Sequence, residues 1–341
     1  MPSQQPNGYS TVEWSEFQEA EPEGTKIYPV LTLPPEIVSE IFLRFLPIYP
    51  GIPPLSGLLS PLLLCRICRQ WREIALSTPT LWNTIRMDIT KPWDDDKAAV
   101  QLELINAWLS RSGDCPLSIT LTDSSDSPLA AQFLQAAILR CARWEHVDLL
   151  IPFEHLHFIE GNMPLLRDLT IGPNEIPDRH GLQVSVFDRA PLLTHVVLTH
   201  DFVPYAIRLP WGQLTHLVGL CLFEHECTEI LSHAVQLVHC TFSIFGSAEP
   251  YRPLPHPTTL PCLRQLVLDS SDIGGGNPMK VLDNFALPGL RTLHVHGVRY
   301  HLLATFIRRS QCTLEELRIN NQTLSEEEYR EVVESSNLDA E

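Results

Sequence analysis

The sequence is poor in basic residues and in long apolar runs. It holds 24 Lys and Arg against 41 Asp and Glu, which gives a formal net charge of −17. This charge repels phosphate backbones, so we expect no general nucleic-acid binding. No apolar run approaches the ~18 residues that a membrane-spanning helix needs, so we expect no membrane span. The first residues, MPSQQPNGYS, have neither a basic n-region nor an apolar h-region, so no signal peptide is expected.

Motifs of catalysis and metal binding are also scarce. The nine cysteines form one C-x-x-C, Cys65 and Cys68, without a second pair at zinc-finger spacing. The glycine run at 274–276 lacks a following Lys-Ser/Thr, and neither G-x-S-x-G nor H-E-x-x-H occurs. We therefore expect a protein that is not an enzyme, with no catalytic residue, no metal and no cofactor. A weaker alternative is a metal-dependent enzyme that uses a Cys/His-rich stretch, Cys221, His225, Cys227 and His233.

The cysteine count also bears on the compartment. Nine is an odd number and ordinary usage for 341 residues. Without a secretion signal, this usage favours reduced thiols and a location in the cytoplasm, the nucleus or both.

Two amphipathic segments follow an N-terminal region that lacks apolar periodicity. The segment LPPEIVSEIFLRFLP predicts a helix with Pro34 and Pro35 in its first turn, and its apolar stripe is Ile37, Val38, Ile41, Phe42, Phe45 and Leu46. The segment LLLCRICRQWREIALS predicts a second helix, whose stripe includes Leu64, Cys68, Trp71 and Ala75. The phrase TPTLW then places Trp82 where it can pack on both helices.

These two segments, in this order, resemble the F-box motif. The resemblance implies helices that pack against Skp1, and through Skp1 a link to a cullin–RING ubiquitin ligase. The residues that it assigns to Skp1 binding are Leu33, Pro34, Glu36, Ile37, Ile41, Phe42, Leu46, Cys68 and Trp71. The sequence departs from the motif in the segment 47–61, where it carries roughly ten more residues than is usual. The alternative is an ordinary helical hairpin that uses the same residues as its core.

From residue 144 onward a pattern L-x-x-L-x-L recurs eight times, at steps of 20 to 27 residues. This period is typical of leucine-rich repeats, in which each repeat supplies one strand and stacks on its neighbours. The asparagine of the longer signature is not kept in most units, so we expect an irregular solenoid. The apolar triplets are Trp144/Val147/Leu149, Leu166/Leu169/Ile171, Leu193/Val196/Leu198, Leu217/Leu220/Leu222, Leu237/Cys240/Phe242, Leu263/Leu266/Leu268, Leu290/Leu293/Val295 and Leu314/Leu317/Ile319.

Side chains between the leucines should face outward, because successive strand residues alternate sides. This outward face is polar and chemically mixed, which suits the recognition of a target protein. The alternative is a solvated face with no partner. The expected target-binding residues are His195, Val197, Thr199, His239, Thr241, Gln265, Asp269, His294, His296 and Arg318.

The expected fold is α/β, with a helical F-box followed by an irregular leucine-rich-repeat solenoid that has a parallel sheet on one face. Between them, KPWDDDKAAVQLELINAWLSR predicts a helix and CPLSITLT a strand that caps the solenoid. The expected divisions are 1–30 disordered acidic tail, 31–85 F-box, 86–143 linker helix and capping strand, 144–324 repeats, and 325–341 C-terminal helix and acidic tail.

The expected function is that of a substrate-recognition adaptor in a Skp1–cullin–F-box ubiquitin ligase. The F-box would bind Skp1 and the repeats would bind an unknown target protein. An alternative is a Skp1-binding scaffold with no role in degradation, and the sequence does not separate these two.

Overall fold

The computed structural model describes residues 29–47, 50–89, 95–123, 128–172, 183–199, 206–246, 253–270, 275–298, 300–320, 322–323 and 327. The acidic segment expected at 1–30 lies outside the described residues, except for Pro29 and Val30. The helix expected in 325–341 also lies outside them, except for Glu327. Among the described helices, none is both long enough and apolar enough to cross a membrane.

The N-terminal part consists of three short helices, α1 (Pro35–Phe45), α2 (Pro61–Ile67) and α3 (Arg69–Leu76). The helix expected through residues 62–77 is therefore two helices. The break falls at Cys68, whose backbone is extended (φ −154°, ψ 172°) and whose sulfur accepts a hydrogen bond from the Trp71 backbone N–H at 3.4 Å. Arg72 Nε donates to the Cys65 carbonyl at 2.7 Å and satisfies an acceptor that the break leaves free. Cys68 thus begins α3 instead of belonging to a continuous stripe.

Trp82 joins these helices to the rest of the chain. It ends a 3-10 turn, η2 (Pro79–Trp82), and is 0% exposed. Its Nε1 donates to the Ala75 carbonyl on α3 at 2.8 Å. Its ring meets Trp108 edge-on, with ring centroids 4.9 Å apart, on α4 (Asp95–Arg111). One apolar core consequently runs from Val38 on α1 to Ile319 in the last parallel strand.

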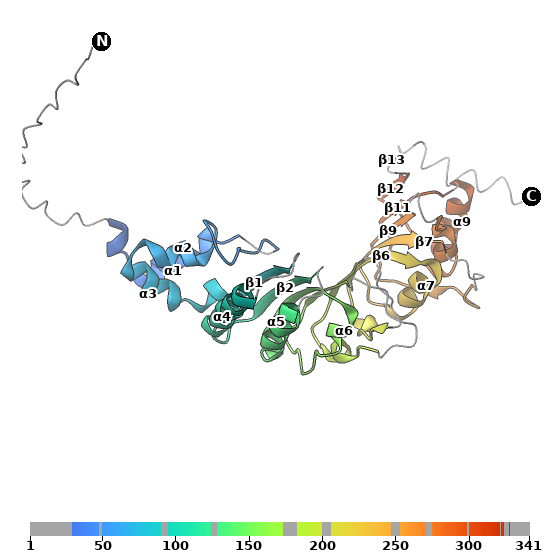
Figure 1. The fold of residues 1–341 in the computed structure, drawn as a ribbon. Helices are drawn as coiled ribbons and strands as arrows, with labels where there is room; N and C mark the ends of the chain where they lie inside the picture. The colour runs from blue at the N-terminus through green and yellow to red at the C-terminus, as the bar shows by residue number, and fades with distance from the viewer. Residues whose placement is uncertain are drawn as a thin grey trace, which may run out of the picture.

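The main feature of the fold is an open sheet that has eleven strands in the described part of the chain, and these follow one another in sequence order (Figure 1). Ten are parallel, and the last, β13 (Gln322–Thr323), is antiparallel to its neighbour. The expectation of an α/β fold with a parallel sheet is confirmed. The parallel strands are β1 (Thr84–Ile89), β2 (Leu117–Asp123), β3 (Trp144–Leu150), β4 (Asp168–Ile171), β5 (His195–Leu198), β6 (His216–Phe223), β7 (His239–Phe245), β9 (Gln265–Ser270), β11 (Thr292–Val295) and β12 (Glu316–Ile319). The short strands β8 (Thr258–Thr259) and β10 (Phe285–Ala286) pair separately.

The segments between strands return along the other side of the sheet. Figure 1 shows the strands on the inner side of a curve and the larger helices, α4, α5, α7 and α9, on its outer side. The helices after α4 are α5 (Pro128–Ile138), α6 (Phe153–Leu156), α7 (Glu224–His233), α8 (Pro278–Leu282) and α9 (Tyr300–Ser310), and the 3-10 turns are η1 (Pro29–Thr32), η3 (Cys141–Arg143), η4 (Val186–Arg189) and η6 (Trp211–Gln213). The strand side opposite the helices is called the sheet face below.

Seven of the eight predicted apolar triplets are buried as expected, and the triplet in β6 is wrong. Leu217 pairs with Val196 and Gly219 pairs with Leu198, so the inward positions are Leu214, Leu217 and Gly219. A side chain at Gly219 would meet the Leu222 and Phe242 side chains, because its Cβ would lie 2.5 Å from Leu222 Cδ1. Glycine thus occupies a leucine position because its neighbours fill the space.

Candidate functional site

Helix α1 carries two apolar stripes, of which the protein covers only one. Val38 and Phe42 are each 1% exposed and point into the core. Ile37 and Ile41, one residue earlier in each turn, are 50% and 44% exposed. Because residues i and i+4 stack on one helical face, these two isoleucines form a continuous apolar strip facing solvent.

Exposed apolar side chains are concentrated in this part of the molecule. Six of the fourteen large apolar side chains that are exposed lie between residues 37 and 76, and the remaining eight are spread over the rest of the described chain. The six, called the N-terminal apolar surface below, are Ile37, Ile41, Leu58, Leu59, Ile67 and Leu76. Of these six, Ile37 and Ile41 share one helical face and form a strip of the kind that another macromolecule can cover.

The expected Skp1-binding residues divide into accessible and inaccessible ones. Phe42 is buried in the chain itself, because its ring packs edge-on against Trp71, with ring centroids 5.0 Å apart, and is enclosed between α1 and α3. Pro34, Glu36, Ile37 and Ile41 are exposed, and Leu33, Leu46, Cys68 and Trp71 are half-buried. Leu58, Leu59 and Ile67 are also exposed, although they were not among the expected Skp1-binding residues. Leu58 and Leu59 lie in the long segment between α1 and α2.

The ten residues expected in target binding all face away from the helices, and none is fully buried. They are spread from β5 to β12, so they do not form one cluster. The strand register brings seven of them into two lines, one with His195, His239 and Gln265 and the other with Val197, Thr241, His294 and Arg318. Arg318 lies 2.6 Å from Glu316, and His294 Nε2 lies 3.6 Å from the same carboxylate.

Five neighbouring strands, β3 to β7, place a row of polar side chains side by side on the sheet face. We call it the histidine row; register pairs each member with the next, in the order His146, Asp168, His195, His216 and His239. His146 and His216 were not among the residues that the sequence pattern placed on the outward face. The error in the β6 triplet hid His216, although the phrases THV, THL and VHC each place a histidine directly before an inward residue.

The histidine row is connected by close contacts. His146 Nε2 lies 2.9 Å and His195 Nδ1 3.2 Å from the two carboxylate oxygens of Asp168. The rings of His195 and His216 are stacked, with centroids 4.1 Å apart and planes inclined by 15°. His216 Nε2 lies 2.7 Å from His239 Nδ1, so a single proton joins these two nitrogens. The row therefore cannot become fully protonated without breaking that hydrogen bond.

Burial lowers the pKa of His216, and the neighbouring His195 and His239 lower it further, while Asp168 acts in the opposite direction. The unfolded chain thus takes up a proton at this residue at a higher pH than the folded protein does. The contribution of His216 to stability is full above its unfolded pKa of ~6.5 and is lost as the pH falls below that value.

His216→Gln tests this coupling. We expect the melting temperature of the wild type to fall between pH 7.5 and pH 5.5, and we expect a smaller fall for the variant, because glutamine does not titrate. Thermal unfolding followed by circular dichroism at both pH values measures this. Equal falls in the two proteins would show that the buried imidazole does not govern the pH dependence.

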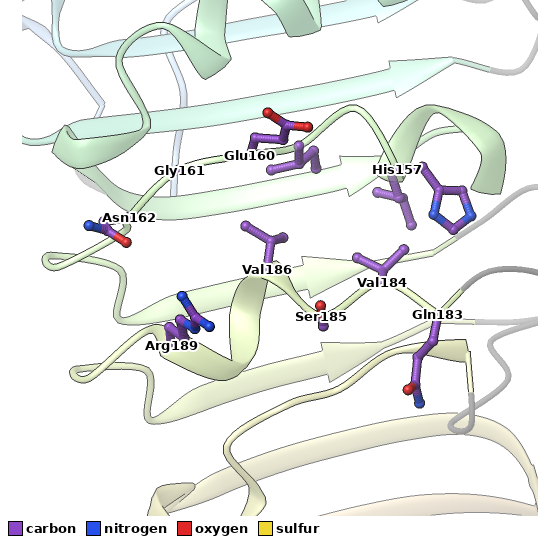
Figure 2. A pocket seen from close by; sticks show the side chains of 11 residues that line it. His157, Glu160, Gly161, Asn162, Gln183, Val184, Ser185, Val186 and Arg189 are labelled. Atoms are coloured by element: carbon purple, nitrogen blue, oxygen red, sulfur yellow. The ribbon is translucent and has the colours of Figure 1, made fainter.

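A cavity that could hold a small ligand lies away from the sheet face, between the segments that follow β3 and β4. Its volume is about 520 Å³. Figure 2 shows His157, Glu160 and Arg189 at separate places around it, with no convergence on one point. Since acid–base or nucleophilic catalysis needs groups within hydrogen-bond reach of one reacting atom, the arrangement favours no reaction.

The Cys/His-rich stretch does not converge either. Cys227 is fully buried on α7, where burial raises the pKa of its thiol well above the ordinary value. His233 and His225 lie exposed on the same helix. Among the described residues, no three or more His, Cys, Asp or Glu side chains are arranged to hold a metal ion. All nine cysteines are free thiols.

Two surfaces thus stand out, the N-terminal apolar surface and the sheet face with its histidine row. Comparison with known proteins adds no family to this description: no protein-family model matches the sequence, and no curated protein is significantly similar to it.

Proposed function

We propose that this protein is an F-box adaptor that binds Skp1 through α1 to α3 and binds a target protein through a leucine-rich-repeat sheet. The observation that carries the proposal is the uncovered strip of Ile37 and Ile41 beside the buried Val38 and Phe42. Full burial of an isoleucine side chain contributes roughly 1.5–3 kcal/mol, so a partner that covers this strip gains a substantial part of its binding energy there.

The N-terminal apolar surface also lies where an adaptor needs it. It belongs to the first helices of the chain, and the strands follow it in order along the curve (Figure 1). The apolar core is continuous from α1 to β12. A target held on the sheet face would then sit at a fixed position relative to a partner bound at α1.

The proposed mechanism is proximity. One end of the protein is fixed to the ligase, and the sheet holds the target so that a ubiquitin-charged enzyme reaches its lysines. The raised effective concentration accelerates the transfer, so the adaptor itself needs no reactive side chain.

Purification of the tagged protein tests this function directly. We expect Skp1 to co-purify in stoichiometric amounts, together with a cullin, and we expect the bound target to accumulate when cullin neddylation is blocked. Mass spectrometry of the purified complex measures all three. Ile37→Glu/Ile41→Glu, which changes only exposed side chains, is the control and should remove Skp1 and cullin together. Skp1 without cullin would point to a scaffold outside degradation, and a complex without Skp1 would refute the proposal.

A further inference from the structure

Lysine is rare in this chain. Of its 24 basic residues, 20 are arginine and four are lysine: Lys26, Lys91, Lys97 and Lys280. Lysine is elsewhere one of the commonest residues of soluble proteins, so this usage is unusual. The stretch 98–341, which includes every described strand after β1 (Figure 1), has 15 arginines and one lysine, Lys280. The chain from β2 onward thus carries a single lysine amine.

Arginine stands at exposed positions where lysine would serve equally well. Arg167, Arg264 and Arg291 directly precede β4, β9 and β11, and all three are exposed or nearly so. Arg167 Nε lies 3.6 Å from Glu145, and Arg291 Nη1 lies 2.5 Å from Glu315. A contact through one nitrogen does not need the planar fork by which arginine differs from lysine. These contacts therefore do not account for the choice of arginine.

The one lysine of this stretch, Lys280 on α8, is held by a buried carboxylate. Its Nζ lies 2.7 Å from Glu224 Oε2, and the Glu224 side chain on α7 is 3% exposed. The other oxygen, Glu224 Oε1, accepts a hydrogen bond from the Asn277 backbone N–H at 2.8 Å. If Lys280 swung away, the carboxylate would stay buried without a counter-charge, which is strongly unfavourable. The ammonium group is thus fixed between α7 and α8.

We propose that the scarcity of lysine and the Glu224–Lys280 ion pair protect this protein from modification by the ubiquitin ligase that it serves. This inference rests on the proposed function, which supplies the ligase. In the transfer step a neutral lysine amine attacks the thioester that joins ubiquitin to the conjugating enzyme. The new amide C–N bond forms, the C–S bond breaks, the cysteine thiolate leaves, and the surplus amine proton passes to water. The guanidinium of arginine stays protonated and does not act as this nucleophile.

The position of the adaptor in the complex makes such protection necessary. The adaptor stays attached to the ligase, so an accessible amine on its own surface meets the charged enzyme at a raised effective concentration in every cycle. That amine competes with the lysines of the bound target. Because arginine keeps the positive charge without offering a reactive amine, its use in place of lysine directs the transfer to the target.

The first experiment measures how accessible Lys280 is. The full-length protein is treated with sulfo-NHS-acetate, and mass spectrometry follows the acetylation of each lysine. We expect Lys280 to react about tenfold more slowly than Lys97, which is exposed on α4. Glu224→Gln should remove this difference, whereas the matched control Glu229→Gln, at an exposed carboxylate of the same helix, should leave it in place. Equal rates at Lys97 and Lys280 in the wild type, a comparison that needs no variant, would overturn the proposal.

The second experiment adds amines to the solenoid. Arg167→Lys/Arg264→Lys/Arg291→Lys keeps the charge, and the matched control Arg167→Gln/Arg264→Gln/Arg291→Gln changes the same positions without adding an amine. Each full-length protein is incubated with Skp1, a cullin–RING complex, ubiquitin, its activating and conjugating enzymes and ATP. Mass spectrometry then locates the modified lysines. We expect the lysine variant to carry about ten times as much ubiquitin on residues 98–341 as the wild type, and the glutamine variant to match the wild type. No gain in the lysine variant would refute the protection.

Failure of this inference differs from failure of the proposed function. Skp1 and cullin bound to the protein are quantified in the same reactions. A protein without Skp1 refutes the proposed function and the protection with it. A protein that holds Skp1 and cullin, yet carries ubiquitin on Lys280 as readily as on the added lysines, refutes the protection alone.

Discussion

Replacement of both Ile37 and Ile41 by glutamate is expected to abolish Skp1 binding without unfolding the protein. The two side chains are 50% and 44% exposed, so charged replacements remain solvated in the free protein. In the proposed complex they are central anchors, and loss of such an anchor costs at least about 2 kcal/mol. If the two losses add, affinity falls by about a thousandfold. Titration calorimetry with purified Skp1 measures this fall.

Val100→Glu/Leu139→Glu is the matched control for this experiment. These side chains are 62% and 84% exposed on α4 and after α5, away from the N-terminal apolar surface. The control makes the same chemical change at two exposed apolar positions and should bind Skp1 like the wild type. Undiminished binding by the Ile37/Ile41 variant would remove α1 from the interface.

Trp82→Ala is expected to destabilise the protein by about 3–5 kcal/mol, the usual cost of removing a large aromatic side chain from a core. The variant loses the edge-on contact with Trp108 and leaves the Ala75 carbonyl without its hydrogen bond from the indole. It also removes the ring beneath the Arg111 guanidinium, which lies 4.8 Å from the centroid. The midpoint of urea unfolding measures the loss of stability. Titration with Skp1 measures whether the N-terminal helices still bind it.

A second tryptophan provides the control for Trp82. Trp211 is only partly buried against the same core, and among the described residues its indole N–H has no hydrogen bond like that of Trp82 to Ala75. Trp211→Ala should therefore shift the unfolding midpoint much less. Similar shifts in the two variants would mean that Trp82 does not join the N-terminal helices to the sheet.

The strands from β3 onward could be predicted because each has the same inward apolar residues at the same spacing. Leu169 and Ile171 in β4 are buried, and so are Leu266 and Leu268 in β9. The pattern failed where one residue departed from it. Gly219 has no side chain to signal an inward position, so the triplet in β6 was placed three residues too late. Strand β1, with the sequence TIRMDI, precedes the repeats and was not predicted.

The candidate site could be predicted in part. Periodicity placed Ile37 and Phe42 on one stripe, but a helical stripe does not tell which of its edges the protein itself covers. That depends on α3, where Trp71 packs on Phe42 and leaves Ile37 outside. The break at Cys68 depends on tertiary contacts too, since nothing in CRICRQW forbids a continuous helix. The histidine row needed the strand register, which only the three-dimensional structure supplies.

The reversed strand at the C-terminal end of the sheet has a consequence for self-association. A row of parallel strands offers unpaired backbone groups at its ends, onto which further chains can add. Here β13 runs against β12 and pairs with it through only two residue pairs, Arg318 with Thr323 and Ile319 with Gln322. A second molecule arriving at this end finds a template of only two residues instead of a full-length strand. The shortness of β13 thus disfavours the addition of further chains at this edge.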